Sequence, residues 1–418
     1  MTAIFGILAT GLTIGVPIAF TLLLTGLVYM LSTGHYPTAF PAYLFGSLNS
    51  SSLLSIPFFI LSAEILSRSG GTDRLIRFVD ACLGHNRGGL PVVAVVATTF
   101  FAAICGSSAA TAAAIGSVMV PKMFERGYDR RFAVGLIATA GGLGILLPPS
   151  VPLIIYGMVT ETSISQLFAA ATIPGLLLAT CLGVAAYVIG RRSGVPPEPR
   201  QPMSVRLRAA WDAAGVLLMP ILILGGIYSG ITTATEAAAC ACVYALVLAM
   251  FYGSSMSEFL DVLTRSTAAA GMILLILGAA TLFSYALTYE RVPHLFLEWM
   301  TGIDLSPTAL MLILMAFFIV CGMFLEVISI ILIVMPILIP VLVAYDISLV
   351  HFAVLLIVNM EIAVISPPIG LNLYIIAMTA KVPVHEVFRG TLPFLGVLLA
   401  FLAAMTFLPG AEFLTLNY

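Results

Sequence analysis

Charged residues are scarce in this sequence. Asp, Glu, Lys and Arg together account for 9% of its 418 residues, whereas a soluble domain carries roughly 25%. Hydrophobic residues account for 61%, and the mean hydropathy is +1.14. This composition excludes an ordinary soluble domain. We interpret the chain as an all-α polytopic membrane protein embedded in the lipid bilayer.

The motifs of several enzyme classes are also missing. The only two lysines, Lys122 and Lys381, do not complete GxxxxGK followed by Ser or Thr, so the chain has no P-loop and should not hydrolyse ATP. None of the five histidines belongs to an HExxH motif. No Ser/His or paired-Asp arrangement lies in an apolar segment, which argues against a membrane-embedded enzyme such as a protease. We therefore expect no catalytic residues, no organic cofactor and no nucleic-acid partner.

The six cysteines do not form a metal or redox motif, because no CxxC is present. Cys240 and Cys242 lie in a helical run, where residues two apart do not face each other. We interpret the cysteines as small buried residues and expect no transition metal.

Apolar runs of roughly 20 residues predict membrane spans. No charged n-region with a cleavage site precedes the first run, so we interpret Thr2–Leu31 as a retained span rather than a signal peptide. Full crossings are expected near residues 3–31, 40–66, 132–159, 164–190, 211–229, 234–252, 267–288, 349–377 and 391–409.

Two further apolar stretches, residues 90–121 and 306–343, are interrupted in the middle. The first is interrupted at Cys105-Gly-Ser-Ser108 and the second at Cys321-Gly-Met-Phe-Leu-Glu326. Each half is too short for an upright span, so we predict two re-entrant helical hairpins whose tips meet inside the membrane. The amphipathic stretch Thr72–Leu83 predicts an interfacial helix, with His294–Met300 as its counterpart on the other side.

The basic residues predict the orientation, because cytoplasmic loops are enriched in Lys and Arg. With a cytoplasmic N-terminus, Arg291 alone falls outside. The other 16 of the 17 basic residues collect on the cytoplasmic side: Arg68, Arg74, Arg77, Arg87, Lys122, Arg126, Arg130, Arg131, Arg191, Arg192, Arg200, Arg206, Arg208, Arg265, Lys381 and Arg389.

The chain divides into halves that repeat. A proline-rich cytoplasmic linker, residues 191–208, separates an N-terminal half, residues 1–190, from a C-terminal half, residues 209–418. Pro121 and Pro340, which close the hairpins, lie 219 positions apart. The base of the first hairpin is basic and the base of the second has no basic residue, which is the pattern of an inverted repeat.

Two proline pairs break apolar helices at corresponding places. Pro148-Pro149 and Pro367-Pro368 cannot donate backbone hydrogen bonds, and they also lie 219 positions apart. Irregular backbone at membrane depth is tolerated only where it is buried in protein or lines a cavity. Paired broken helices are typical of the binding site of a secondary transporter.

Small and polar residues surround the first tip and the first break. Half-helix ends and unwound carbonyls can bind ions there, and the alternative is that small residues merely let helices pack closely. We predict a Na⁺ site between tip and break, formed by Ser107, Ser108, Gly142, Pro148, Pro149 and Ser150, with Thr111, Gly141 and Gly144 beside it.

A second polar cluster lies around the second tip and break. Ionisable groups inside a membrane are functional candidates, because an unpaired charge there costs about 3 kcal/mol or more. Glu326 could ligate a cation, carry a proton or cap the second half of its hairpin. Glu361 could equally be a protonated or hydrogen-bonded residue that packs two helices together. The cluster contains Gly322, Glu326, Asn359, Glu361, Ser366, Pro367, Pro368 and Asn372.

Two other polar pairs have structural explanations. Thr233 and Glu236 have the spacing of a capping box at the start of a helix. Glu64 can pair with Arg68 four residues later.

Together these stretches resemble the large membrane subunit of the tripartite ATP-independent periplasmic (TRAP) transporters. The resemblance implies an elevator-type fold in which a transport domain holding two hairpins moves against a scaffold. It also implies import of an organic acid with Na⁺ across the bacterial inner membrane, with a periplasmic binding protein and a separate small subunit of four helices as partners. The matching stretches are residues 100–111, 144–150, 235–238, 322–326, 359–362 and 366–372.

The resemblance assigns one Na⁺ site to Ser107, Ser108 and the first break. It assigns the other to Gly322, Glu326 and the break at Ser366, Pro367 and Pro368. The family pattern implied by the resemblance has aspartate in many members at the second tip, where this chain has Glu326. We assign the remaining polar residues to the substrate: Thr111, Asn359, Glu361 and Asn372.

The sequence thus predicts an inverted-repeat permease that imports a small carboxylate with Na⁺ by an elevator movement. A stand-alone cation-coupled carboxylate transporter, a membrane-embedded enzyme and a channel are the alternatives.

Overall fold

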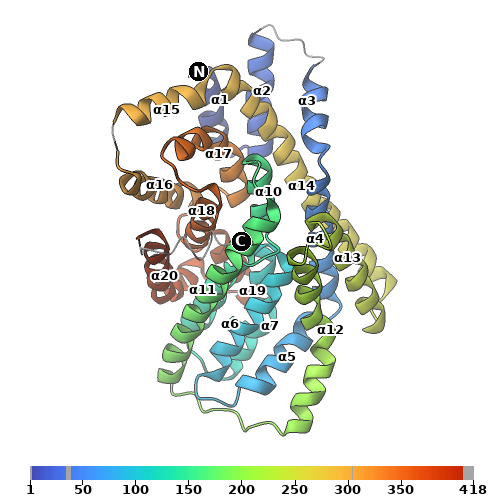
Figure 1. Cartoon of the computed structure of the whole chain (residues 1–418). Coiled ribbons are helices and arrows are strands. Elements are labelled where there is room, and N and C mark those ends of the chain that lie inside the picture. Colours follow the sequence, from blue (N-terminus) through green and yellow to red (C-terminus); the bar gives the residue numbers. More distant parts are fainter. Residues whose placement is uncertain (1, 34–38, 304, 408–418) are drawn as a thin grey trace.

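The computed structural model describes residues 2–33, 39–303 and 305–407, and these ranges contain helices but no strand. Figure 1 shows them in chain order. They are α1 (Thr2–Thr13), α2 (Ile18–Ser32), α3 (Ala39–Leu48), η1 (Ser51–Leu54), α4 (Ser55–Arg68), α5 (Gly71–Leu83), α6 (Gly89–Cys105), α7 (Ser108–Glu125), α8 (Arg130–Ala140), α9 (Leu143–Leu146), α10 (Val151–Val159), α11 (Ile164–Arg192), α12 (Met203–Tyr228), α13 (Ala234–Phe251), α14 (Met256–Tyr289), α15 (Val292–Gly302), α16 (Pro307–Gly322), α17 (Val327–Ala344), α18 (Leu349–Ala363), α19 (Leu371–Ala380) and α20 (Val384–Phe407).

By length and composition, eight segments of the described residues can cross a membrane. The structure confirms an all-α polytopic fold. The eight segments are Ser51–Arg68, Arg130–Val159, Ile164–Arg192, Met203–Tyr228, Ala234–Phe251, Met256–Tyr289, Val327–Ala344 and Val384–Phe407.

The predicted single crossing near residues 3–31 is wrong. The structure places two shorter helices there, α1 and α2, separated by a turn in which Gly15 has φ +79° and Pro17 precedes α2. The helices fold back on each other, and a Cβ on Gly11 would lie 2.6 Å from Cγ2 of Thr21. A positive φ is accessible to glycine at little cost, so the turn forms within an apolar stretch.

The predicted crossing near residues 40–66 is also interrupted, because α3, η1 and α4 share that stretch. The crossings predicted near 164–190, 211–229, 234–252 and 267–288 correspond to α11, α12, α13 and α14, and α14 begins earlier, at Met256. The last predicted crossing corresponds to α20, and its final two positions lie outside the described residues.

Both helical hairpins are present. The first consists of α6 and α7, which meet at Gly106 with φ +66°. The second consists of α16 and α17, and its turn ends at Glu326. The carboxylate of Glu326 accepts a hydrogen bond of 3.0 Å from the backbone N–H of Ile328. Of the three roles predicted for Glu326, the structure therefore confirms that it caps the second half of its hairpin.

Both broken helices are present as well. In the first, α8 and α9 precede the break and α10 follows it. In the second, α18 ends at Ala363 and α19 begins at Leu371. The Pro148–Pro149 and Pro367–Pro368 peptide bonds are both cis.

The repeat seen in the proline spacing extends to whole helices. α7 and α17 each have 18 residues, and their first residues, Ser108 and Val327, lie 219 positions apart. Figure 1 shows the first hairpin toward the end of the molecule where α5 lies, and the second toward the end where α15 lies. The two hairpins therefore have opposite orientations.

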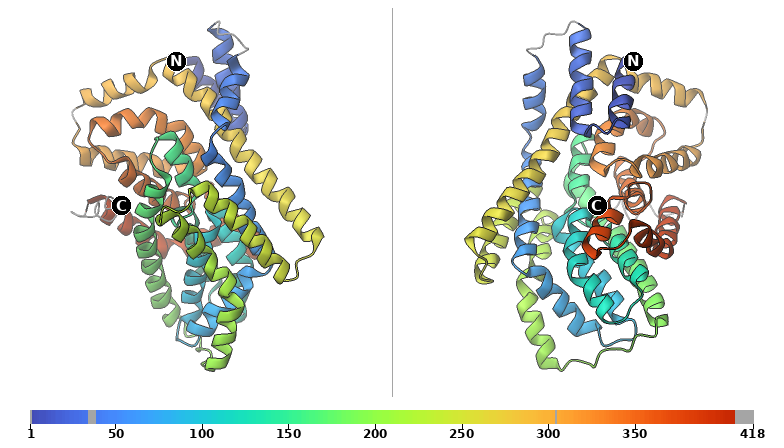
Figure 2. Two further views of the ribbon diagram at one scale, coloured as in Figure 1. Left: turned by 45° about the vertical axis from the view of Figure 1, so that its right-hand side comes forward. Right: turned by 180° about the vertical axis from the view of Figure 1, so that it is seen from behind.

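The helices pack in two groups. The frame group, residues 2–33, 39–68 and 203–289, holds α4 against α13 and α14, and α14 against α2 and α3. The hairpin group, residues 89–192 and 307–407, holds α8 against α20, α11 against α6, and α19 against α7. Figure 2 shows α14 and α2 along one side of the molecule, with α17–α20 on the other.

α5 and α15, the two helices that the sequence predicts to be interfacial, each contact both groups, and the groups also touch directly through α14 with α17 and α4 with α6. α5 packs against α12 and α6, and α15 packs against α14 and α17. The ammonium of Lys122 at the base of the first hairpin donates a hydrogen bond of 2.6 Å to Asp80 of α5. At the base of the second hairpin, the hydroxyl of Tyr345 donates one of 3.2 Å to the carbonyl oxygen of Met300.

Two smaller predictions are confirmed. Thr233 and Glu236 form a reciprocal capping box at the start of α13. Glu64 lies 3.5 Å from Arg68. Cys240 is exposed and Cys242 is buried, as expected for residues two apart on a helix. The prediction that the cysteines are small buried residues is wrong for four of the six, because Cys181 and Cys240 are exposed and Cys82 and Cys321 are only partly buried.

Candidate functional site

The tip of the first hairpin touches the first break through backbone atoms. The carbonyl oxygen of Gly106 accepts a hydrogen bond of 3.2 Å from the N–H of Val151. A Cβ on Gly106 would lie 2.6 Å from the carbonyl oxygen of Pro149, and one on Gly144 would lie 2.5 Å from that of Ser107. Any larger residue at either glycine would push tip and break apart.

Serine side chains cap the two helices that start at this junction. The hydroxyl of Ser107 accepts from the N–H of Ala110 at 3.5 Å and caps α7. The hydroxyl of Ser150 accepts from the N–H of Leu153 at 3.4 Å, caps α10, and donates to the carbonyl oxygen of Ile145 at 2.5 Å. Ser108 is buried as the first residue of α7. The structure therefore brings Ser107, Ser108 and Ser150 together with Pro149, as the sequence predicts.

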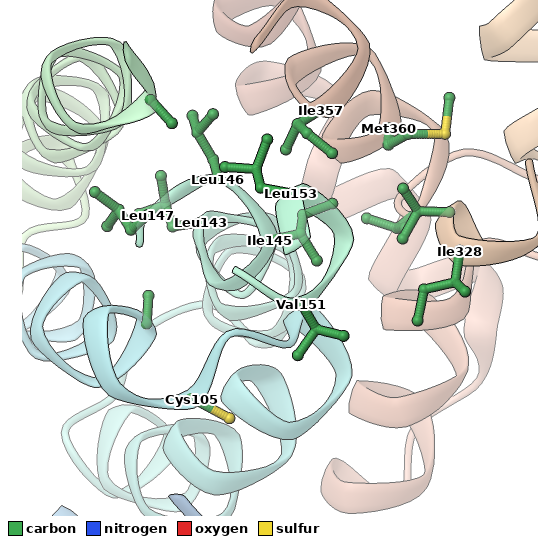
Figure 3. Packing of buried hydrophobic residues seen from close by; sticks show 14 of the residues in the cluster. Cys105, Leu143, Ile145, Leu146, Leu147, Val151, Leu153, Ile328, Ile357 and Met360 are labelled. Atoms are coloured by element: carbon green, nitrogen blue, oxygen red, sulfur yellow. The ribbon is translucent and has the colours of Figure 1, made fainter. Parts of the chain in front are cut away.

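The first break is fully enclosed. All residues from Phe132 to Gly157 are buried, including Pro148 and Pro149. Figure 3 shows Ile145, Val151 and Leu153 between Cys105 of the first hairpin and Ile328, Ile357 and Met360 of the second half. This burial satisfies the requirement that irregular backbone at membrane depth be covered by protein.

The second tip and break also meet, but they are more open. The N–H of Ile369 donates a hydrogen bond of 3.2 Å to the carbonyl oxygen of Met323. A Cβ on Gly322 would lie 2.5 Å from Cβ of Ala363. Ser366 is buried and donates to the carbonyl oxygen of Ile362 at 2.7 Å. Pro367, Pro368, Ile369 and Glu326 are exposed, so this junction is accessible in the conformation described.

The residues assigned to the substrate do not all lie together. Nδ2 of Asn359 donates to the carbonyl oxygen of Met315 at 2.8 Å, so this side chain faces α16. Glu361 faces the first broken helix instead, where its Cγ would lie 3.3 Å from a Cβ on Gly142. Asn372 donates to the carbonyl oxygen of Ala138 at 3.0 Å. Thr111 lies against Gly144, so three of the four assigned side chains converge on residues 138–144 and Asn359 does not.

Oxygen atoms dominate both junctions. Backbone carbonyls, hydroxyls, amides and carboxylates suit a hard cation, whereas transition metals favour imidazole and thiolate. No group of three or more His, Cys, Asp and Glu residues that could hold a metal occurs among the described residues. Each junction contains carbonyl and hydroxyl oxygens, from Gly106 and Ser150 at the first and from Met323 and Ser366 at the second.

Sequence reasoning missed the backbone contacts that bring each tip to its break. Gly106 and Met323 contribute carbonyl oxygens rather than side chains. For Gly106, its place between Cys105 and Ser107 in the tip was an available signal. For Met323, its place in the second tip between Gly322 and Phe324 was the same kind of signal.

A family model described as "Tripartite ATP-independent periplasmic transporter, DctM component" matches residues 3–411 of the chain. The chain is 41% identical over 377 residues to the C4-dicarboxylate TRAP transporter large permease protein DctM of Pseudomonas aeruginosa, covering 90% of this chain and 88% of that protein. It is 33% identical over 398 residues to the sialic acid TRAP transporter large permease protein SiaM of Vibrio cholerae, covering 94% and 93%.

A third relative is longer than this chain. The isethionate TRAP transporter permease protein DctMQ of Oleidesulfovibrio alaskensis is 34% identical over 413 residues, which cover 98% of this chain but 65% of that protein. Among solved structures, the YdaH transporter of Alcanivorax borkumensis matches with a TM-score of 0.62 and 13% identity, covering 88% of this chain and 86% of that one. That likeness shows a shared fold.

Proposed function

Because the chain belongs to the DctM component family of TRAP transporters, we propose that it is a permease subunit that imports a small organic acid together with Na⁺. The observation that carries this proposal is the pair of junctions between a hairpin tip and a broken helix, one in each repeat. Such junctions hold ions and substrates in secondary transporters.

The coupling to Na⁺ is supported by the oxygen-rich chemistry of the junctions. At the first, the carbonyl oxygens of Ser107 and Pro149 and the hydroxyls of Ser107 and Ser150 lie within one small region. At the second, Glu326 adds a carboxylate at the end of the hairpin tip, where it caps α17. We assign one Na⁺ to each junction, with Gly142 supporting the first, and Gly322, Ser366, Pro367 and Pro368 shaping the second.

An organic acid as the substrate is supported by the names of the relatives. They transport C4-dicarboxylates, sialic acid, isethionate or ectoine. The substrates differ while the membrane protein remains similar, so we propose that a periplasmic binding protein selects and delivers the substrate. The relative named DctMQ extends beyond the region that matches this chain, which supports a small membrane subunit as a partner.

An elevator movement is supported by the two packing groups. The hairpin group contains both junctions, and it is bound to α5 and α15 through the hydrogen bonds of Lys122 and Tyr345. It also touches the frame group directly where α17 packs against α14 and α6 packs against α4. We propose that the hairpin group moves against the frame group and carries ions and substrate across the membrane.

We place the basic end of the molecule, with residues 191–208, in the cytoplasm. Figure 1 shows the N-terminus at the opposite end, near α15. On this orientation the N-terminus lies outside the bacterial inner membrane. The sequence prediction of a cytoplasmic N-terminus depended on a single crossing at residues 3–31, and the structure replaces that crossing with the α1–α2 pair.

The test is uptake of radiolabelled C4-dicarboxylate or sialic acid into proteoliposomes that contain the chain, its small subunit and the binding protein. We expect uptake to require an inward Na⁺ gradient, and uptake that persists without Na⁺ would refute the coupling. Transport by the chain alone, without the binding protein, would instead support the stand-alone carboxylate transporter.

Replacing the first proline pair tests the role of the break. In the double variant Pro148→Ala and Pro149→Ala, the helix can continue through the junction, and we expect uptake to be abolished. Pro220→Ala is the matched control, because Pro220 lies inside α12 of the frame group, away from both junctions. Normal uptake by the double variant would refute the role assigned to the break.

A further inference from the structure

The segment between α11 and α12 is an extended chain rich in proline. α11 ends at Arg192 and α12 begins at Met203, so residues 193–202 form no helix. The backbone of Pro202, with φ −61° and ψ 155°, is close to the polyproline II conformation. Such a segment is a semi-rigid spacer rather than a flexible coil. Its prolines are Pro196, Pro197, Pro199 and Pro202.

Every third residue of this segment faces the protein. Val195, Glu198 and Gln201 are partly buried, and the two residues between each of them and the next are exposed. A polyproline II helix has three residues per turn, so the three side chains lie on one face. Val195 packs against the hydrophobic core. The segment therefore lies along the surface of the protein, at the end where α5 lies (Figure 1).

The start of the segment is held at the first leg of the first hairpin. Gly88, which precedes α6, has φ +74°. A Cβ on it would lie 2.7 Å from the backbone nitrogen of Arg191, and a Cβ on Gly190 would lie 2.8 Å from Cγ of Pro91. The end of α11 therefore packs directly on the start of α6.

The middle of the segment is held at the second leg. The carboxylate of Glu198 forms an ion pair with the guanidinium of Arg126, which follows the last residue of α7. The side chain of Glu198 is only 16% exposed. Burial raises the pKa of the Tyr128 hydroxyl, Arg126 opposes that rise and Glu198 adds to it, so the three groups lie close together. The segment thus crosses the open end of the first hairpin and is attached to both of its legs.

From these contacts we propose that residues 193–198 form a strap that travels with the hairpin group, and that the pair of Arg126 and Glu198 confines the hinge between the two groups to residues 199–202. The proposal rests on the movement of the hairpin group against the frame group proposed above. The strap begins at α11 and is attached to α7, both in the hairpin group, and it continues into α12 of the frame group.

The ion pair sets the length of chain that is free to connect the groups. An extended polyproline segment spans about 3.1 Å per residue, so the chain from Glu198 to Met203 reaches about 16 Å. Without the pair, Val195 is the next anchor and the reach grows to about 25 Å. Arg126 and Glu198 are therefore positioning residues, which limit how far the hairpin base can move from the start of α12.

The first test measures the distance between two spin labels in the purified complex without its native cysteines. The labels are attached at the exposed positions Glu125→Cys, beside the ion pair, and Arg200→Cys, in the hinge. We expect a narrow distribution of distances. Glu198→Gln should widen it at least about two-fold, because the strap then leaves the hairpin. A width that Glu198→Gln leaves unchanged would overturn the proposal.

The charge swap Arg126→Glu with Glu198→Arg should restore the narrow distribution, and its failure to do so would overturn the ion pair as the attachment. Asp261→Asn is the matched control, because it removes a charged pair with Arg265 inside the frame group. It should leave the width unchanged. If Glu198→Gln does not yield folded protein, Arg126→Gln decides the question by the same measurement.

The second test asks whether the attachment persists during transport. Cysteines at positions 126 and 198, joined by a short bismaleimide, keep the strap on the hairpin permanently. We expect uptake into proteoliposomes at the wild-type rate, because the strap travels with the hairpin group. Loss of uptake, while each single-cysteine variant treated with the same reagent stays active, would show that the pair must open and would overturn the hinge assignment.

The two tests separate the strap from the proposed function. The distance measurement decides the attachment without any transport. A wild type that shows no Na⁺-driven uptake refutes the proposed function, and the narrow and widened distributions then still support or overturn the attachment of residues 193–198 to the first hairpin.

Discussion

Gly135 and Gly390 touch through their backbones where α8 crosses α20. A Cβ on Gly135 would lie 2.0 Å from the carbonyl carbon of Gly390, and one on Gly390 would lie 1.9 Å from the carbonyl oxygen of Arg131. Both distances are to rigid backbone, so a side chain at either position must separate the two helices. This is how small residues permit close helix packing in membranes.

We predict that Gly390→Ala destabilises the protein by about 1–3 kcal/mol or more, the usual cost of overpacking. Thermal unfolding of the purified protein measures the effect. Gly396→Ala is the control, because it lies in the same helix with nothing within 4 Å of its position. Alanine should be neutral or stabilising there, since glycine is a poor helix former. Equal melting temperatures for the two variants would contradict the close crossing.

The pair of Lys122 and Asp80 should contribute to stability more than an exposed pair does. Its side chains are 26% and 15% exposed, compared with 59% and 49% for Arg265 and Asp261. Asp80→Asn should cost about 1.5–3 kcal/mol, as expected for a hydrogen bond to a charged group. Asp261→Asn should cost below about 1 kcal/mol. Unfolding curves that rank the two variants in the opposite order would disprove this.

The two breaks should differ in accessibility. In a variant without native cysteines, Ile369→Cys should react with a water-soluble maleimide at least about ten-fold faster than Ile145→Cys, because burial blocks access of the reagent to the thiol. The two side chains are 47% and 2% exposed. Labelling rates in proteoliposomes measure the difference, and similar rates would show that the first break opens as freely as the second.

Ser150 should be needed for both stability and uptake. Its hydroxyl caps α10 and binds the carbonyl oxygen of Ile145, so Ser150→Ala removes both interactions. The loss of a cap costs about 0.5–2 kcal/mol, and we expect uptake to fall with it. Ser117→Ala is the control, because Ser117 is an exposed residue of α7 that binds only the carbonyl oxygen of Ala114. Wild-type melting and uptake for Ser150→Ala would refute the role of this cap.

The sequence was most informative at the positions where prolines, glycines or serines interrupt an apolar run. Proline pairs at membrane depth and Gly-Ser tips have few structural solutions, so the hairpins and broken helices could be predicted with nearly correct bounds. Gly15 and Pro17 also interrupt an apolar run, but that run has the length of a membrane span, so a single crossing was predicted there. The α1–α2 pair was missed for that reason.

Side-chain partners were harder to predict. Asn359 and Glu361 are two residues apart on α18, so helix geometry turns them to different faces, and grouping them in one site ignored that geometry. The contact between Asn372 and Ala138 spans 234 positions and depends on how two repeats pack. No local sequence pattern encodes such a contact. The convergence of Thr111, Glu361 and Asn372 on residues 138–144 could therefore not be predicted.

The contacts at the base of the first hairpin and at the base of the second differ in kind. The attachment of each hairpin should therefore respond differently to electrolytes on its own face of the membrane. Lys122 and Asp80 are held by opposite charges, and Tyr345 binds Met300 as a neutral donor and acceptor. Mobile ions weaken attraction between charges over a Debye length of about 8 Å at physiological ionic strength, and they leave a neutral hydrogen bond nearly unaffected. A rise in salt on the first face would therefore weaken the attraction between Lys122 and Asp80, though less than for an exposed pair because both side chains are partly buried. The same rise on the other face would leave the hydrogen bond between Tyr345 and Met300 nearly unchanged.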